Sequence, residues 1–383
     1  MKKVYSFLLL VSVLFVFSCT LPKEIEVRGS TSTLKFGAAF DFGQMLTDMI
    51  TESFSGNDDV DEFEIIECNA DTRTYIIYMK LFEEELQSII DDKLAGYLSG
   101  SYYNVGSDVT LLEKNIDAIN LEGLNDVING FEFTGIKSKL FVSGSDIVEH
   151  LAMNIDIDNE SIIDEAPLSG FDKDEESGFN QDVWKDYKYF SELSGGHEVD
   201  IDILINGDGN AALDIDVFVK SGEIIPVGLV TTGIMIKAEL VIWIPMELKP
   251  VGTEDNPDEA ELKFPKDAFE DIGGFIESVS EYVESMTITV GMNNNPFEEG
   301  YLVMSQPDTS FKITNPLNDK SLIFKVSPSD MKQIINYGSN FKPVVSIKFD
   351  KNNTSKITIP KDVDTTHVSL NAKLSYTIDL GGE

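Results

Sequence analysis

Six stretches of this chain alternate apolar and polar residues with period two, and this pattern constrains the fold more than any other feature of the sequence. Such alternation puts every second side chain on the same face of a strand, so that one face can be buried while the other meets water. The stretches are residues 131–142, 199–205, 213–219, 234–244, 341–349 and 368–380. They predict an α+β, β-dominated fold of antiparallel sheets with a few packed helices and an elongated shape.

Residues 224–246 are apolar enough to be compared with a membrane span. They include Pro226, Lys237, Glu239 and Pro245, and the even-numbered residues from 234 to 244 are all apolar. Charges and prolines are unfavourable in a membrane helix, whereas alternation is typical of a strand. We therefore interpret residues 234–244 as a strand of a sheet.

Helical periodicity is less common and occurs in residues 44–54, 82–97, 181–193 and 267–286. The last pattern is the strongest, because Pro265 precedes it, acidic residues occupy its first turn and its apolar residues form one stripe. Gly273 and Gly274 weaken its middle. We expect a helix over residues 267–286 that packs by its stripe.

Segments rich in acidic residues, proline and glycine indicate how the chain is divided. The stronger of two such segments is residues 249–261, and it predicts a domain boundary. The expected parts are a signal peptide (1–18), a lipidated tether (19–30), an N-terminal β-rich domain (31–249), a linker (250–260) and a C-terminal β-rich domain (261–383) that contains the helix.

The first residues indicate export. Lys2 and Lys3 precede an uncharged apolar run, residues 4–17, which ends at Ser18 and Cys19. A run of about 14 residues rises roughly 21 Å as a helix, less than the ~30 Å hydrocarbon core of a bilayer, so the pattern favours a cleaved signal peptide. The cysteine at its end resembles the lipobox of bacterial lipoproteins, which implies that Cys19 is acylated, for example with palmitate.

This lipobox is relaxed, because Val16 and Phe17 stand where the usual box has leucine and a small residue. Relaxed boxes of this kind resemble those of spirochaetes. Three further segments accompany the box: the opening residues 21–27, the sequence LKFPKD at 262–267 and the closing strand at 368–380. Together these features resemble those of large acidic, treponeme-type envelope lipoproteins. The resemblance implies a β-rich protein anchored in the cell envelope, at the outer membrane, and implies no activity.

Once Cys19 is acylated, Cys68 has no partner within the chain, which contains 2 cysteines. Its neighbours are strand-forming and include no cation within three residues that would lower its pKa. We expect a buried, inert thiol.

The charge of the chain excludes some partners. Lys and Arg number 29 against 67 Asp and Glu, for a net charge of −38. Phosphate groups would be repelled, so nucleic acids are not expected partners. Anionic lipid headgroups would be repelled too, so the lipid anchor is the expected contact with the membrane and the folded body should stand away from it.

No common catalytic motif is present. His150, His197 and His367 are far apart and lack the spacing of a zinc site. Residues 207–212 match a dinucleotide-binding turn, but a strand pattern follows instead of the helix that would hold a pyrophosphate. We expect no catalytic residue, no cofactor and no enzymatic activity.

One candidate site is a cation site between residues 199–205 and 213–219. If these stretches form a hairpin centred on Asp208, then Asp200 opposes Asp216 and Asp202 opposes Asp214. Like charges directly opposite each other are destabilising, and Ca²⁺, which binds carboxylate oxygens, would remove that repulsion. The alternative is a solvated acidic face that is screened by salt.

These observations favour a membrane-anchored envelope lipoprotein with a non-enzymatic binding or structural role, whose partner is an unknown protein or a small apolar ligand. One alternative is a carrier of lipid or another apolar ligand, with residues 234–244 and the helix at 267–286 as cavity walls. Another is an enzyme with an unrecognised acidic site. Residues 97–106 mix Tyr with Ser, Gly and Asn, as binding loops do, although Tyr is also common in strands.

Overall fold

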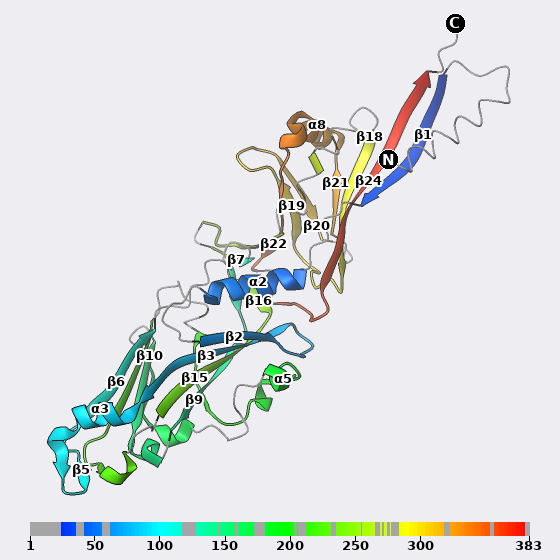
Figure 1. The fold of residues 1–383 in the computed structure, drawn as a ribbon. Coiled ribbons are helices and arrows are strands. Elements are labelled where there is room, and N and C mark those ends of the chain that lie inside the picture. The colour runs from blue at the N-terminus through cyan, green and yellow to red at the C-terminus, as the bar shows by residue number, and fades with distance from the viewer. Residues whose placement is uncertain are drawn as a thin grey trace.

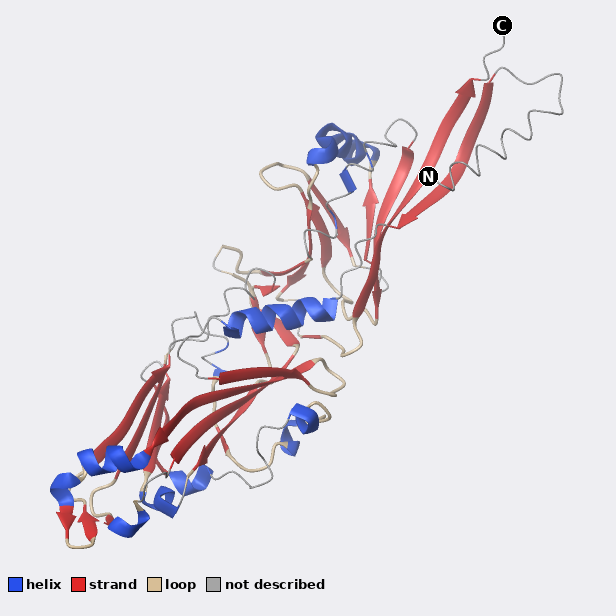
Figure 2. Cartoon of the chain, in the orientation of Figure 1, coloured by secondary structure: helices blue, strands red, loops and turns tan. Residues whose placement is uncertain are grey.

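A computed structural model describes most of the chain and shows an elongated, strand-dominated molecule (Figure 1, Figure 2). The described residues are 24–35, 42–55, 62–116, 128–144, 146–157, 160–171, 181–202, 205, 212–230, 235–253, 255–264, 269, 272–273, 276, 283–317, 322–352 and 356–379. Within them, antiparallel strands form six sheets, and the helices are few. The predicted fold class is confirmed. The predicted signal peptide and Cys19 lie outside the described residues.

The central sheet of one half has the order β12-β9-β15-β3-β2. Its strands are β2 (Glu62–Glu67), β3 (Thr74–Glu85), β9 (Lys137–Ser143), β12 (His197–Glu198) and β15 (Met235–Pro245). Along β15, Leu240 and Ile242 belong to the main hydrophobic core, and Val241 and Trp243 belong to a second, aromatic core. Burial on both faces explains why this strand is apolar almost throughout, and it confirms the strand predicted at 234–244.

A second sheet in the same half has the order β11-β10-β13-β6. Its strands are β6 (Val109–Ile116), β10 (Ala152–Ile157), β11 (Glu160–Pro167) and β13 (Leu213–Val219). Ile155, Ile215 and Val217 are buried in the same core as Leu240, so the two sheets share one hydrophobic interior. β13 has the bounds that the alternation predicts.

The other half contains two larger sheets, ordered β20-β19-β22-β17-β7 and β1-β24-β18-β21, and a three-stranded sheet ordered β23-β16-β8 connects it to the first half. The strands are β1 (Glu24–Lys35), β7 (Ile128–Asn129), β8 (Phe131–Phe133), β16 (Glu247–Pro250), β17 (Glu259–Lys263), β18 (Val283–Asn293), β19 (Tyr301–Ser305), β20 (Lys312–Pro316), β21 (Leu322–Val326), β22 (Val344–Asp350), β23 (Ile357–Thr358) and β24 (Asp364–Asp379). The alternation predicted at 131–142 is split into β8 and β9, with Gly135 at φ 76° between them.

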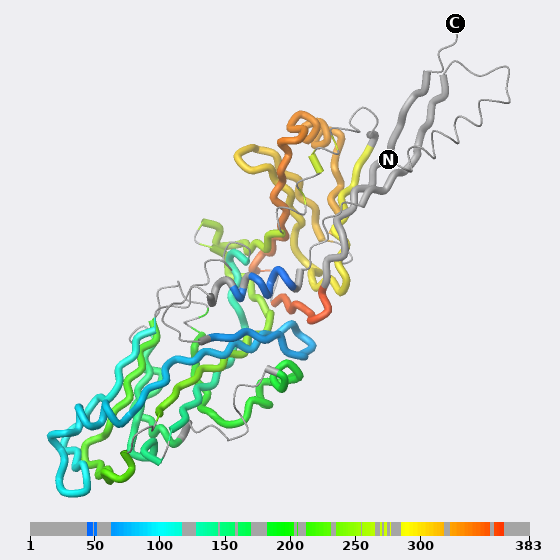
Figure 3. The backbone as a smooth tube through the Cα atoms, viewed as in Figure 1, coloured from blue at the N-terminus to red at the C-terminus, as the bar shows by residue number. Residues whose placement is uncertain are grey.

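Strand pairing crosses the predicted domain boundary. β7 pairs with β17, β16 pairs with β23, and β1 pairs with β24, so residues on either side of 250–260 share three sheets. The predicted linker is itself held in place, because the backbone N–H groups of Val251 and Gly252 donate to the carbonyl of Gly130 (2.9 and 3.0 Å). Figure 3 also shows the chain near residue 360 beside the turn between β2 and β3.

Strand β1 begins inside the predicted tether. It pairs with β24 from Glu24 opposite Asp379 to Lys35 opposite Ser369. β18 pairs with β24 only as far as Leu374. Among the described strands, residues 375–379 of β24 therefore pair with β1 and with no other strand. This ladder extends away from the body of the molecule (Figure 1).

The described helices follow the predicted patterns in part. α2 (Phe42–Ser55) confirms the helix at 44–54, and α3 (Leu86–Lys93) begins later than predicted because residues 82–85 belong to β3. In 181–193, only α5 (Gln181–Trp184) and the 3₁₀ turn η4 (Phe190–Glu192) are helical. The other short turns are η1 (Ala95–Tyr97), η2 (Asp146–His150), η3 (Leu168–Phe171), η5 (Val227–Leu229) and η7 (Gly338–Asn340).

Two helical elements differ from the sequence prediction. The described residues Ile272 and Ile276 are helical and buried, but the predicted end at residue 286 is wrong because β18 begins at Val283. Residues 286–290 alternate with period two and bury Met286 and Ile288. They form a strand because they pair with β21 on one side and β24 on the other. Helix α8 (Pro328–Tyr337) was not predicted, although Ser327 caps its first turn.

Candidate functional site

A small sheet lies at the end of the molecule opposite the start of β1 (Figure 1). It consists of β4 (Leu98–Ser99), β5 (Tyr102–Asn104) and β14 (Ile224–Pro226), in the order β14-β5-β4, and we call it the tip sheet. β4 and β5 are joined by a tight turn in which Gly100 has φ 66°, a conformation that glycine adopts without steric cost.

The register gives the tip sheet two different faces. Tyr103 is directly opposite Ile225, and both are buried, at 5% and 0% exposure. Their neighbours Tyr102 and Ile224 therefore belong to the outer face, where they are 49% and 55% exposed. Leu98, on the edge strand β4, is 54% exposed. Leu98 is opposite Tyr103 in the register, so it lies on the face of Tyr103 and not on that of Tyr102. The segment 97–106, whose composition is typical of binding loops, thus contains two strands, and β5 exposes Tyr102 and buries Tyr103.

Acidic residues flank the tip sheet. The hydroxyl of Tyr103 donates to Asp91 at the end of α3 (3.0 Å), and Asp108 accepts from the backbone N–H of Ser221 (2.8 Å). Glu223 precedes β14 and lies 2.9 Å from Nδ1 of His150. Burial raises the pKa of the Tyr103 hydroxyl, and the hydrogen bond to Asp91 raises it further. Two lysines lie on flanking elements: Lys93 is the exposed last residue of α3, and Lys220 is paired with Glu165 (3.1 Å).

The predicted hairpin that would join four aspartates is wrong. β13 pairs with β10 and β6 and not with residues 199–205. Residues 199–201 instead follow β12 along β9, where the Val199 N–H donates to the carbonyl of Ser138 (3.2 Å). Residues 202 and 205 are helical, and the turn residue Asp208 lies outside the described residues.

The aspartates of β13 have other acidic neighbours. Asp214 is opposite Asp156 and Asp216 is opposite Glu113, so they share one face of the sheet. Burial raises the pKa of Asp216, and the charges of Glu113, Asp156 and Asp214 raise it further. Among the described residues, no group of three or more His, Cys, Asp or Glu side chains is arranged to hold a metal ion. The Ca²⁺ site predicted at Asp200, Asp202, Asp214 and Asp216 required residues 199–205 to pair with β13, and β13 pairs with β10 and β6 instead.

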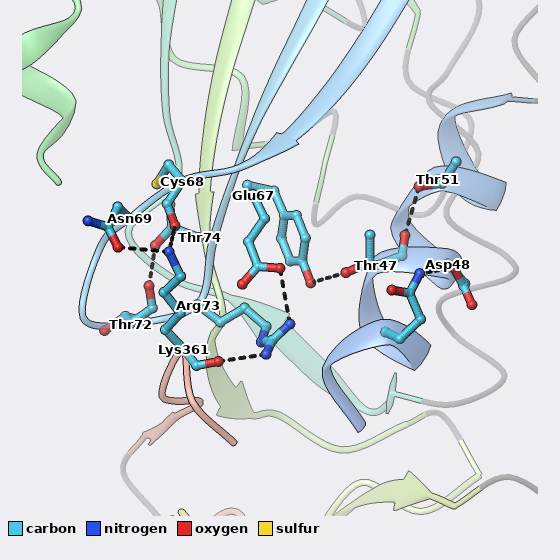
Figure 4. Close-up of polar contacts among 12 residues, drawn as sticks. Thr47, Asp48, Thr51, Glu67, Cys68, Asn69, Thr72, Arg73, Thr74 and Lys361 are labelled. Atoms are coloured by element: carbon cyan, nitrogen blue, oxygen red, sulfur yellow. Dashed lines mark hydrogen bonds and ion pairs between the residues drawn. The ribbon is translucent and has the colours of Figure 1, made fainter. Parts of the chain in front are cut away.

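A buried polar junction connects the turn between β2 and β3 to the C-terminal part of the chain (Figure 4). Arg73 is 6% exposed, and its guanidinium donates to Glu67 (3.2 Å) and to the carbonyl of Lys361 (2.6 Å). The ammonium of Lys361 donates in return to the carbonyl of Cys68 (3.0 Å) and to Oδ1 of Asn69 (2.9 Å). Nε of Arg73 is buried without a hydrogen-bond partner, whereas the other donors named here meet protein acceptors. We interpret the junction as structural.

Two surface grooves are lined by polar and apolar residues together. The larger, of about 820 Å³, lies between the segment after β18 and β23, and its lining includes Asn294, Glu298, Lys356 and Thr358. A second, of about 350 Å³, lies beside β9 and contains Asp200 among its lining residues. The walls expected for an apolar carrier are packed instead: Ile236, Leu240 and Ile242 of β15, with Phe269 and Ile276, are buried in the main core.

Cys68 is free and buried, as predicted. Burial raises the pKa of its thiol. His150 contacts Glu223, and His197 lies in β12. His150 thus belongs to η2 and His197 to β12.

No family model, no curated protein and no solved structure matches this chain. Within the described residues, no helix is both long and apolar enough to cross a membrane. The assignment of the tip sheet as the candidate functional site therefore depends on its geometry alone. The signal from segment 97–106 identified two of its strands. β14, more than a hundred residues further along, begins the apolar stretch 224–246 but was not predicted as a strand.

Proposed function

We propose that this protein is a lipid-anchored envelope lipoprotein, located at the outer membrane of a bacterium, which holds a binding surface away from the lipid and catalyses no reaction. The observation that carries the proposal is the placement of two ends. β1 begins at Glu24, five positions after Cys19, at one extreme of the molecule, and the tip sheet lies at the other extreme (Figure 1).

The geometry between these ends suits a spacer. β1 has 12 residues, which at about 3.3 Å per residue extend roughly 40 Å. A lipid on Cys19 would place the ladder next to the membrane and the tip sheet farthest from it. The net charge of −38 favours the same arrangement, because anionic headgroups repel an acidic body.

The anchor is tested by replacing each cysteine in turn. We expect Cys19→Ala to lose incorporated palmitate and to move from the detergent phase to the aqueous phase. The matched Cys68→Ala variant, which removes a buried thiol, should keep both the label and the detergent partition. Detergent partition of Cys19→Ala equal to that of the parent would contradict the proposal.

A further inference from the structure

We propose that the outer end of the β1–β24 ladder lies in the interfacial layer of the membrane that holds the lipid anchor. The inference rests on the proposed anchor and adds a second contact with the bilayer, made by the protein itself. The ladder section in question consists of residues 24–28 of β1 and 375–379 of β24, which pair with each other. We call it the end ribbon, and it extends away from the body of the molecule (Figure 1).

The register gives the end ribbon one apolar face and one polar face. Ile25 is opposite Ile378, and Val27 is opposite Tyr376, so these four positions share one face. The positions between them belong to the other face, and all of them are polar or charged: Glu24, Glu26, Arg28, Ser375, Thr377 and Asp379. The end ribbon is therefore amphipathic along both of its strands.

The apolar face of the end ribbon continues the face that forms the core of the body. Within the body, β24 places Ala372 opposite Met286 of β18, which is 3% exposed and belongs to the main hydrophobic core. The register shift between β1 and β24 is an extra residue in β1 after Arg28, so β24 itself alternates regularly from Ala372 to Ile378. Tyr376 and Ile378 thus lie on the core face, beyond the point where β18 ends its pairing.

The position of the anchor indicates that lipid covers this face. From Cys19 to Glu24 the chain advances by five residues, which reach at most about 18 Å when fully extended. The end ribbon therefore lies close to the surface of a membrane that holds an acylated Cys19.

The interfacial layer of a bilayer suits an amphipathic two-stranded ribbon. Two strands by themselves are only marginally stable in water, and burial of an apolar face stabilises them. Tyrosine is common at membrane–water interfaces. Backbone groups at the edges of a two-stranded ribbon need water, which places the end ribbon in the hydrated headgroup layer and keeps it out of the hydrocarbon core.

The test compares the two faces with a fluorophore that reports a polar or an apolar environment. The mature chain carries a hexahistidine tag in place of Cys19 and binds phosphatidylcholine vesicles that contain a nickel-chelating lipid. Cys68 is buried, so a maleimide dye reacts with a cysteine introduced by Ile378→Cys on the apolar face or by Thr377→Cys on the polar face. Ser99→Cys, at an exposed position of the tip sheet, is the distant control.

We expect the dye at position 378 to shift its emission to shorter wavelength on vesicle binding. Phosphatidylcholine with a nitroxide near the headgroup end of its acyl chain should quench this dye more strongly than the dye at 377, and the dye at 99 should stay unquenched. Adding Ile25→Ser/Val27→Ser to the 378-labelled chain should reduce the quenching, because these positions share its face.

Two results would overturn the membrane contact. One is equal quenching, or no quenching, at positions 377 and 378. The other is an emission at 378 that is already shifted without vesicles, which would show that another part of this chain or a second copy covers the face. The tag replaces the lipid, so neither result depends on acylation of Cys19, and the palmitate assay of Cys19→Ala decides the anchor independently.

Discussion

At the level of single residues, a buried carboxylate in the central sheet needs charged and hydrogen-bonding partners to offset the free-energy cost of its burial. Glu239 is 2% exposed, its Oε1 lies 2.6 Å from Nζ of Lys237, and it accepts the hydroxyl of Tyr78. An unpaired buried carboxylate is costly. We expect Lys237→Met to lower the free energy of unfolding by about 3 kcal/mol, because removing one partner leaves the other charge buried. Urea denaturation would measure the loss.

Two further variants separate this effect from the loss of a lysine in general. Adding Glu239→Leu to Lys237→Met removes the unpaired charge and should recover part of the stability. Lys185 and Asp182 are as close as the buried pair, at 2.7 Å, but are 52% and 89% exposed, so Lys185→Met should leave the unfolding midpoint unchanged. An equal loss in both lysine variants would show that burial of Glu239 is not the cause.

At the scale of elements, the acidic face of β13 predicts a dependence on pH. The pKa of Asp216 is raised by burial, then by Glu113, Asp156 and Asp214, so the folded protein favours its protonated form. That contribution to stability is complete below the ordinary value of 3.8 and is lost as pH rises through the raised folded value. At neutral pH the ionised carboxylate therefore opposes folding.

Asp216→Asn should consequently raise the unfolding midpoint at neutral pH, and the gain should shrink as the pH falls towards 3.8. Asp92→Asn, on the exposed side of α3, is the control and should give no comparable gain. Thermal melts of the three proteins across this range would measure the effect. A gain that is as large in acid as at neutral pH would mean that repulsion among these carboxylates is not its source.

At the scale of the whole molecule, the first and last strands hold the end of the molecule that lies opposite the tip sheet. Among the described strands, only β1 pairs with residues 375–379 of β24, whereas β18 pairs with β24 within residues 364–374. A chain that starts at residue 36 should therefore lose hydrogen-exchange protection at 375–379. Amides of β24 that bond to β18, and those of the central sheet β12-β9-β15-β3-β2, should keep theirs. Loss of protection throughout the body would mean that β1 supports the entire fold.

The elements whose pattern is local and strong could be predicted from the amino-acid sequence. Residues 213–219 and 234–244 became strands and residues 44–54 became a helix, because periodic burial of apolar side chains is encoded within about ten neighbouring residues. The burial of Cys68 and the β-dominated class followed from the same local chemistry.

Which strands are neighbours depends on contacts between distant parts of the chain, and the sequence pattern did not predict it. Adjacent stretches that could form a hairpin, 199–205 and 213–219, separated because β13 buries Ile215 and Val217 between β10 and β6. β14 completed the tip sheet from more than a hundred residues away, and the strand that begins at residue 283 ended a helical pattern. A strand's alternation specifies which face is buried but not its partner, and the partner is chosen by the burial of apolar area over the whole chain.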